Sequence, residues 1–451
     1  MTRRRRIALL VLAALALVYV HRLYYPYLSP GDSSLSWTRR GPGDEDVLNG
    51  TLGLGRIFVI NLPSRHDRRD AMAAAGGVSN LNLTFLEGLT ADMVAPPLST
   101  GKGAADAATK PSQAGARGSW GSHVKALQTV VDMGLGSALV LEDDVDWDVR
   151  LKAQMRTFAM ASRMWLDIEA QRRETTTSRR RGGIAGGVPS GSPDSEKREQ
   201  QQESEVGSES SPAGSDDGGA IRGEYARDTV PLSSGRLPST QGRTKSPYGD
   251  DWDVLWLGHC GADLPGARQE PASGDPLSSS LKISIPRDPT VPAPKHLQPH
   301  PFALRDRLAD AYPAHTRVVH AARGNVCSLA YAVNRRGARK LLRAFSAAGF
   351  VDQFDLMLRD YCMGGGGEHG REEEGLVCLT VQPPLISHHY AGEHGGASVS
   401  DIRGQGGGLA RGKRGTPYVR LSVQGNLQRL VAGLAEDQLV DQLPDDGDTL
   451  W

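Results

Sequence analysis

Short apolar segments alternate with amphipathic segments over residues 55–165, and this alternation predicts an α/β fold. The apolar runs in IFVINL, NLTFLEGLT and SALVLEDD are typical of buried strands. SRHDRRDAMAAA and SHVKALQTVVDMG are predicted as helices, with Ser64 and Ser122 as caps and Gly134 as a stop. Strands and helices that follow one another in this order form a mainly parallel sheet.

A second segment with the same pattern covers residues 250–403. DWDVLWLGHCG and SLAYAV are predicted strands, and the helix expected over Arg335–Phe345 has one apolar face. VDQFDLMLRDYC is predicted as a helix, and LTVQPPLISHHY as a strand that breaks at Pro383-Pro384. We expect the two segments to be the two halves of one domain.

Three other regions lack this periodicity. Residues 26–54 are rich in Pro, Gly and Asp and are predicted to be a stem. Residues 166–249 are predicted to be a disordered insertion, since runs such as SEKREQQQESEVGSESSPAGSDDGG bury too little apolar surface to offset the entropy of ordering. A regulatory segment that binds partners is the alternative there. Residues 404–451 are predicted to be a weakly structured tail, with a short helix near LVAGLAEDQLVDQL.

The N-terminus has the pattern of a membrane anchor. Arg3 to Arg6 precede an apolar run, Ile7 to Val20, which Leu23, Tyr24 and Tyr25 can extend. We predict a cytosolic tail over 1–6, a signal anchor over 7–25, and a lumenal remainder in the Golgi or endoplasmic reticulum, which is a type II topology. A cleaved signal peptide has the same layout and is the alternative.

Composition and cysteine spacing narrow the class of protein. The formal net charge is zero, so no global field favours nucleic acid. The four cysteines have no CxxC spacing, which makes a zinc site unexpected. In an oxidising lumen they can form two disulfides in three possible pairings, of which we favour the one with Cys362–Cys378.

The stretch SALVLEDDVDWD ends a predicted strand with five acids within seven positions. At the carboxyl edge of a parallel sheet, where ligands bind, such acids suit a hard cation, Mg²⁺ or Mn²⁺, that also binds a substrate diphosphate. Side chains alternate along a strand, so Glu142 and Asp144 share one face, and Asp146 joins them, as a D-x-D pair with Asp144, only if the extended conformation persists past Val145. The alternative is an acidic turn that caps the next helix.

Six segments in one order resemble glycosyltransferase family 25, the lipooligosaccharide and procollagen galactosyltransferase group. They are RIFVINLPSRHDRR, GSWGSHVKALQ, ALVLEDDV, DWDVLWLG, CSLAYAVNRRGARKLL and VDQFDLML. The resemblance implies a GT-A-like nucleotide-sugar-binding fold, with a mixed sheet flanked by helices. It also implies UDP-galactose-like donors, Mn²⁺ and inversion at the anomeric carbon.

The sequence departs from the family pattern at two places. In GARGSWGSH, Ala116 replaces a glutamate and Ser119 a cysteine. In PPLISHHYAGEHGGASVSDIR, His388 and His389 stand near a position where the family often has a glutamine. These changes leave the acceptor open.

The resemblance assigns candidate roles, each with a structural alternative such as a helix cap, a turn or a solvated helix face. The metal ligands are expected among Asp144, Asp146 and His388, with Mn²⁺ or Mg²⁺ as the cation. Inversion needs a base that takes the acceptor proton, and the candidate catalytic residues are Asp352, Asp355 and His123. The expected donor-binding residues are Arg65, Arg68, Arg69, Ser122 and Asp143.

The function expected from these features is transfer of a hexose, galactose first, from a UDP-sugar to a hydroxyl of a glycan or glycoprotein. The same fold using UDP-glucose or UDP-N-acetylglucosamine is one alternative. A catalytically silent relative that acts as a lumenal binding or scaffold protein is the other. Nucleic acid is not an expected partner, since the basic runs have no aromatic platform beside them.

Overall fold

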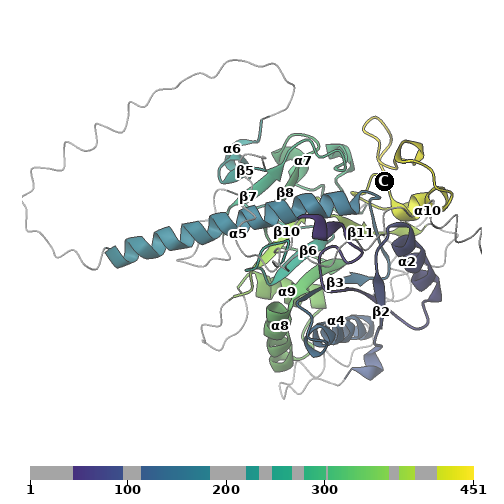
Figure 1. The fold of residues 1–451 in the computed structure, drawn as a ribbon, viewed down its shortest axis with the longest axis horizontal. Coiled ribbons are helices and arrows are strands. Elements are labelled where there is room, and N and C mark those ends of the chain that lie inside the picture. The colour runs from purple at the N-terminus through teal and green to yellow at the C-terminus, as the bar shows by residue number, and fades with distance from the viewer. Residues whose placement is uncertain are drawn as a thin grey trace, which may run out of the picture. The chain divides into compact units, whose positions relative to one another are not determined.

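A nine-stranded mixed sheet forms the centre of the molecule, with strand order β2-β1-β3-β9-β6-β10-β8-β7-β5 (Figure 1). The computed structural model describes residues 44–94, 113–182, 220–232, 246–266, 279–300, 303–364, 375–391 and 414–451. The described residues all belong to one compact unit. The predicted α/β class, a mixed sheet flanked by helices, is confirmed.

The strands of the sheet are short; those between the edge strands β2 and β5 are largely buried, whereas these two are partly exposed. They are β1 (Ile57–Asn61), β2 (Leu83–Glu87), β3 (Ser137–Glu142), β5 (Thr229–Pro231), β6 (Val254–Gly258), β7 (Lys282–Ile285), β8 (Arg317–Ala321), β9 (Ala330–Asn334) and β10 (Cys378–Gln382). Outside it, β4 (Val145–Trp147) pairs with β11 (Ile386–His388), and β12 (Tyr390–Ala391) pairs with β13 (Arg414–Gly415).

Helices cover both faces of the sheet. The longer ones are α2 (His66–Val78), α4 (Ala114–Asp132), α5 (Leu151–Gly182), α8 (Arg335–Ala348), α9 (Phe354–Cys362) and α10 (Val423–Val431). Two are single turns, α6 (Gly223–Ala226) and α7 (Leu308–Ala311). The 3₁₀ turns include η1 (Asp44–Leu48), η2 (Ala91–Met93), η6 (Pro294–His296) and η8 (Glu436–Gln438).

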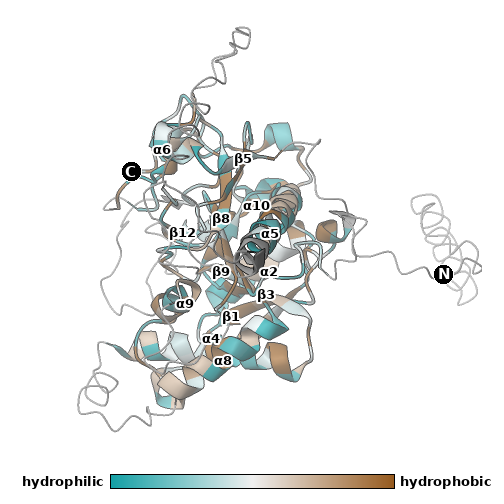
Figure 2. Cartoon of the chain, turned by 90° about the vertical axis from the view of Figure 1, so that its left-hand side faces the viewer, coloured by the Kyte–Doolittle hydropathy of each residue, from teal (hydrophilic) through white to brown (hydrophobic). Residues whose placement is uncertain are grey.

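Alternation along the strands divides the core in two. In β1, Ile57 and Val59 belong to a cluster with side chains of α2, α5 and α10, whereas Phe58 belongs to a second cluster with α4, α8 and α9. Successive side chains of a strand point to opposite faces, so one buried strand supplies both cores. In Figure 2, brown, hydrophobic positions are seen along the central strands, and teal, hydrophilic ones on helix α8 outside them.

Three parallel strands place their carboxyl ends together. β1 pairs in parallel with β2 and with β3, and the registers align Asn61 with Glu87 and Ile60 with Glu142. The antiparallel strand β9 then separates β3 from β6. The edge formed by the ends of β1, β2 and β3 is where an open α/β sheet binds ligands.

The predicted boundaries of the domain are too narrow. Val47 and Leu52, inside the predicted stem, are buried in the core. Within the predicted insertion, α5 continues past residue 166, and β5 pairs with β7 at the edge of the sheet. Isolated apolar residues such as Ile168 and Val230 supply the packing in an otherwise polar sequence. Residues 183–219 and 233–245 lie outside the described residues.

The C-terminal segment is also more ordered than the sequence predicts. Residues 414–451 include α10, which Ser422 caps by accepting a hydrogen bond from the Gly425 amide. Val423 is fully buried in the core. The predicted weak structure is therefore wrong for this part of the tail.

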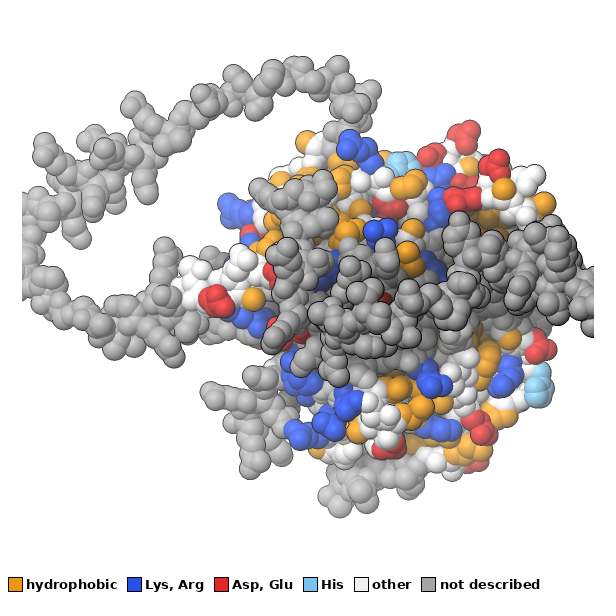
Figure 3. Space-filling view, in the orientation of Figure 1, with side chains coloured by type: hydrophobic (Ala, Val, Ile, Leu, Met, Phe, Trp, Pro, Cys, Tyr) orange, Lys and Arg blue, Asp and Glu red, His pale blue; other side chains and the backbone are white. Residues whose placement is uncertain are grey.

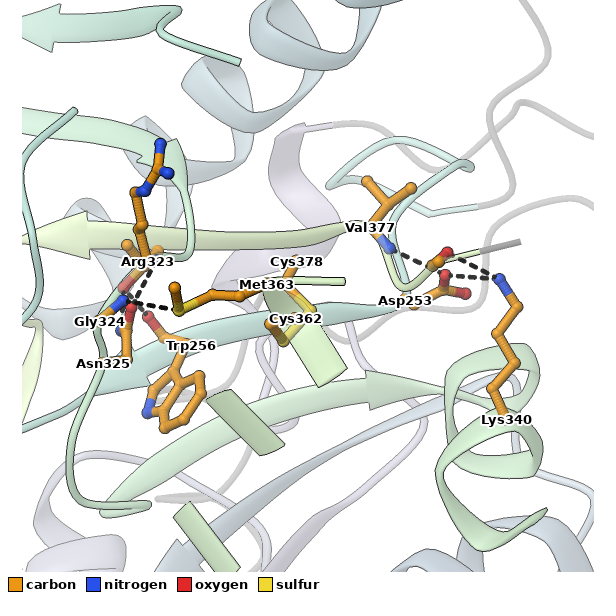
Figure 4. Close-up of a disulfide and its surroundings, with 12 residues drawn as sticks. Asp253, Trp256, Arg323, Gly324, Asn325, Lys340, Cys362, Met363, Val377 and Cys378 are labelled. Carbon is orange, nitrogen blue, oxygen red and sulfur yellow. Dashed lines mark hydrogen bonds and ion pairs between the residues drawn. A yellow bond between two sulfur atoms is a disulfide. The ribbon is translucent and has the colours of Figure 1, made fainter. Parts of the chain in front are cut away.

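Two disulfides link the four cysteines. Cys362–Cys378, the predicted pair, joins the end of α9 to the start of β10 (Figure 4), and Cys260–Cys327 is the second. Beside the first, the buried carboxylate of Asp253 accepts hydrogen bonds from Lys340 Nζ at 3.1 Å and the Val377 amide at 3.1 Å. Asp253, the second aspartate of the segment DWDVLWLG, thus has a structural role.

In the part of the chain that the structure describes, no helix has the length and apolarity needed to cross a bilayer. The predicted anchor over 7–25 and the tail over 1–6 lie outside the described residues. On the face drawn in Figure 3, basic and acidic side chains are interspersed among apolar ones.

Candidate active site

A cavity of about 380 Å³ lies at the carboxyl edge of β1, β2 and β3. Glu142 is the last residue of β3, and Asp143 and Asp144 form the turn that leads to β4. All three acids line the cavity, and an apolar and small-residue wall faces them from the end of β1, the loop after β2 and helix α4. That wall contains Ile60, Leu62, Gly88, Leu89, Ala91, Ala114, Gly115 and Gly118.

Asp143 and Asp144 share one guanidinium. Arg68 Nη1 lies 2.7 Å from Asp143 Oδ1 and 3.0 Å from Asp144 Oδ2. Asn61 Nδ2 donates to the other oxygen of Asp143 at 2.8 Å. His388 Nε2 lies 3.4 Å from Asp144 Oδ2. Asp143 is therefore held on both oxygens, whereas the protein partners of Asp144 lie on one.

The pKa values of Asp143 and Asp144 are shifted in opposite directions. Burial, then the charge of Asp144, raises the pKa of Asp143 against the opposing effect of Arg68. Burial acts to raise the pKa of Asp144 as well, but His388 and Arg68 outweigh it and lower this pKa. The negative charge of the pair is thus concentrated on Asp144.

Asp144 and His388 carry donor atoms of the kind that bind a divalent cation, and the imidazole nitrogen that lies near Asp144 is Nε2. Asp144 Oδ1 and His388 Nδ1 are both buried without a hydrogen-bond partner, which is costly unless a ligand satisfies them. Carboxylate oxygen and imidazole nitrogen suit Mn²⁺, whose remaining ligands can be water and phosphate. Among the described residues, no group of three or more His, Cys, Asp or Glu could hold a metal ion.

The structure places Asp146 away from the cavity, in contrast to its predicted role as a metal ligand. Asp146 is fully buried, and its Oδ1 accepts the amides of Trp147 at 2.8 Å and Gln424 at 3.1 Å. Its Oδ2 accepts the hydroxyls of Thr416 at 2.8 Å and of Ser422. The carboxylate is therefore occupied in anchoring the C-terminal segment to β4.

Of the three predicted donor-binding arginines, Arg68 lines the cavity. Arg65 forms an ion pair with Asp67 at 2.9 Å. The guanidinium of Arg69 lies over the Phe85 ring, 4.4 Å from its centroid. Arg65 and Arg69 are not among the residues that line this cavity.

Ser122 and His123 lie in the middle of α4, so the prediction that Ser122 caps this helix is wrong. Ser122 Oγ donates to the Gly118 carbonyl and accepts the Leu89 amide, both at 2.7 Å. It thereby fixes the cavity-lining loop after β2 to α4. The His123 ring is buried, stacks on Phe354 with centroids 4.3 Å apart, and lies 3.5 Å from Glu142 Oε1.

The two aspartates that are candidate bases, Asp352 and Asp355, have different surroundings. Asp352 is exposed and its Oδ1 accepts the Gln353 amide. Asp355 Oδ2 accepts the Cys327 amide at 2.7 Å. Burial raises the pKa of Asp355, the Cys327 hydrogen bond opposes this, and the charge of Glu142 adds to it. Asp355 is therefore close enough to the cavity acid Glu142 for the charge of Glu142 to raise its pKa.

Two residues of the site were not predicted. Asn61 ends β1 and holds Asp143, and a polar residue at the end of an apolar strand was an available signal. Ser328 Oγ donates to Glu142 Oε1 at 2.8 Å and lies 3.3 Å from His123 Nε2. It comes from a loop far away in the chain, and no local pattern indicates its partners.

The comparison with known families agrees with this geometry. Residues 55–177, from β1 into α5, match the family described as Glycosyltransferase family 25 (LPS biosynthesis protein). The match supports glycosyltransferase family 25. It covers Arg68, His123 and all three cavity acids, and it supports a glycosyltransferase that acts on a sugar donor and an acceptor. No curated protein matches the chain.

Proposed function

We propose that the chain transfers a hexose, galactose first, from a UDP-sugar to a hydroxyl of a glycan or glycoprotein. The observation that carries the proposal is the placement of Asp144. Asp144, which Arg68 and His388 contact through Oδ2 and whose Oδ1 is unpartnered, lines a cavity within the segment that matches the family. UDP-glucose and UDP-N-acetylglucosamine are the alternative donors.

The cavity has a polar wall and an apolar wall, which suit different parts of such a donor. Arg68 and the acidic turn form a polar side, where a guanidinium can pair with diphosphate oxygens. Ile60, Leu62 and the glycine-rich side of α4 form an apolar side that suits a flat ring. A donor that combines a base, a diphosphate and a sugar would contact both.

In the proposed reaction, Asp144 and His388 would hold Mn²⁺ or Mg²⁺, which would neutralise charge on the leaving diphosphate. Asn61 and Arg68 keep Asp143 in place beside that ligand pair. An inverting displacement also needs a general base near the acceptor hydroxyl. Asp355, next to Glu142, fits that role better than the exposed Asp352.

We also propose a Golgi or endoplasmic reticulum location with a type II anchor. The support is the basic start and the apolar run of Ile7 to Val20, together with two disulfides, which persist in oxidising compartments. Protease protection of the tagged protein in sealed microsomes tests it. Digestion of the C-terminal tag without detergent would contradict a lumenal domain.

Donor hydrolysis tests the function. The purified full-length protein is incubated with a panel of UDP-sugars in Mn²⁺, in Mg²⁺ or in EDTA, and released UDP is measured. We expect turnover with at least one UDP-hexose and a loss of about 100-fold or more in EDTA, since the cation stabilises the transition state by several kcal/mol. Equal turnover in EDTA would overturn the metal role. Failure to bind any UDP-sugar would favour the scaffold alternative.

A further inference from the structure

The disulfide Cys260–Cys327 fastens a loop that lies beside the cavity. It joins the residues after β6 to the loop before β9, with 5.5 Å between the two Cα atoms. The same two segments exchange hydrogen bonds between Cys260 N and Val326 O at 2.8 Å and between Val326 N and Gly261 O at 3.1 Å. Trp256 Nε1 donates to the Cys327 carbonyl at 3.0 Å.

Cys327 has a backbone conformation that needs such support. Its φ is +66°, in the left-handed region that residues with a Cβ seldom adopt. A conformation of this kind persists only where the surrounding structure imposes it. Here the crosslink and the hydrogen bonds on both sides impose it.

Consecutive residues of this loop hold two carboxylates from different elements. The Cys327 amide donates to Asp355 Oδ2 of α9 at 2.7 Å. The Ser328 hydroxyl donates to Glu142 Oε1 of β3 at 2.8 Å and lies 3.3 Å from His123 Nε2. The loop therefore determines how Glu142 and Asp355 are oriented toward each other.

We propose that Ser328 and the Cys260–Cys327 disulfide are positioning residues for the acceptor side of the site. This inference rests on the proposed function, because the two carboxylates matter for catalysis only if an acceptor hydroxyl attacks there. A displacement of about 1 Å in reacting groups can reduce turnover by about 100-fold. Release of the loop should thus lower kcat while donor binding, through Arg68 and the apolar wall, is retained.

The second disulfide supplies a matched control. Cys362–Cys378 ties α9 to β10 beside the structural cluster of Asp253 (Figure 4). Removing either disulfide should reduce stability, by about 2–4 kcal/mol in typical cases. Only the loss of Cys260–Cys327 should change the orientation of Glu142 and Asp355.

The experiment compares the double variants C260S/C327S and C362S/C378S with the wild type, each assayed well below its melting midpoint. We expect C260S/C327S to lose about tenfold or more in kcat for UDP-sugar hydrolysis, with a donor KM within about twofold of the wild type. We expect C362S/C378S to keep its kcat. Equal kcat losses in both, or none in the first, would overturn the proposal.

Ser328 provides an arm that does not depend on the disulfide variants folding. Ser328→Ala should lower kcat about tenfold at unchanged donor KM, whereas Ser328→Thr, which keeps the hydroxyl, should restore most of it. A Thr variant as impaired as the Ala variant would contradict a positioning hydrogen bond.

Hydrogen exchange separates failure of this inference from failure of the proposed function. The loop 323–329 should exchange faster in C260S/C327S than in the wild type, and the start of α9 should follow, because Asp355 loses its amide partner. If the wild type turns over no UDP-sugar, the proposed function fails while this exchange result still decides the positioning. Unchanged exchange in the loop would overturn the positioning.

Discussion

Asp144 and Asp146 are two positions apart, yet their carboxylates meet opposite surroundings. Asp144 borders the cavity with one buried oxygen unpartnered. Asp146 is fully buried and each of its oxygens accepts two hydrogen bonds. At the residue scale, the first is free to bind a ligand and the second holds the fold together.

Asp146→Ala should therefore destabilise the protein strongly. It leaves two amides and two hydroxyls buried without their acceptor, so we expect a loss of about 3 kcal/mol or more in the free energy of unfolding. Asp144→Ala, which leaves Arg68 paired with Asp143, should lose less than about 1 kcal/mol. Urea denaturation of both variants measures this, and a smaller loss for Asp146→Ala than for Asp144→Ala would contradict the assignment.

At the scale of elements, the apolar wall of the cavity depends on close contact between α4 and the loop after β2. A Cβ added at Gly118 would lie 2.6 Å from the Leu89 carbonyl oxygen, so the backbone would have to shift. Ser122 binds the same loop one turn later. The shape of the cavity is therefore set by a glycine and a serine of the helix.

Gly118→Ala should weaken UDP-sugar binding by about tenfold or more, because the loop moves and the wall is displaced. Gly77→Ala on α2 is the control, since an added Cβ there meets nothing within 4 Å. It should leave binding unchanged and favour the helix by up to about 1 kcal/mol. Calorimetric titration measures both, and equal donor affinity in the two variants would exclude this role for Gly118.

The sequence predicts those elements that have a clear period. β1, β3, β6 and β9 and the amphipathic face of α8 follow directly from their apolar patterns. The edge strand β5 and helix α10 do not, because each is ordered mainly by tertiary contacts: β5 by pairing with β7, and α10 by its buried Val423. Long polar flanks hide such short segments.

The site shows the same limit. Asp143, Asp144 and Arg68 lie close to ends of predicted strands, so topology alone brings them together. Ser328 and His388 reach the acids from segments more than 180 residues away, and β11 must first pair with β4 to bring His388 there. Which face of β4 Asp146 takes is also decided by that pairing.

On the scale of the whole molecule, the buried polar groups make stability depend on pH. His259 is almost fully buried, with Nε2 donating to the Val381 carbonyl and Nδ1 unpartnered. Burial lowers the pKa of His259 to about 4. The unfolded chain, with a histidine pKa near 6.5, therefore binds a proton that the folded state does not.

The contribution of His259 to stability should be complete above pH 6.5 and decrease as the pH falls toward 4, by about 3 kcal/mol in total. His259→Gln, which can still donate to Val381, should reduce the pH slope of the unfolding free energy in this window. His66→Gln, at an exposed position on α2, is the control and should retain the slope. An unchanged slope in His259→Gln would contradict a buried neutral imidazole.

The most direct test of the proposed active site is the Mn²⁺-dependent release of UDP from UDP-hexose by Asp144→Asn. Asp132→Asn, at an exposed position at the end of α4, is the control. We expect Asp144→Asn to lose about 100-fold or more in kcat/KM, with a melting midpoint and an Asp132→Asn activity close to those of the wild type. Wild-type turnover by Asp144→Asn would show that Asp144, in the turn after β3, is not part of the catalytic site.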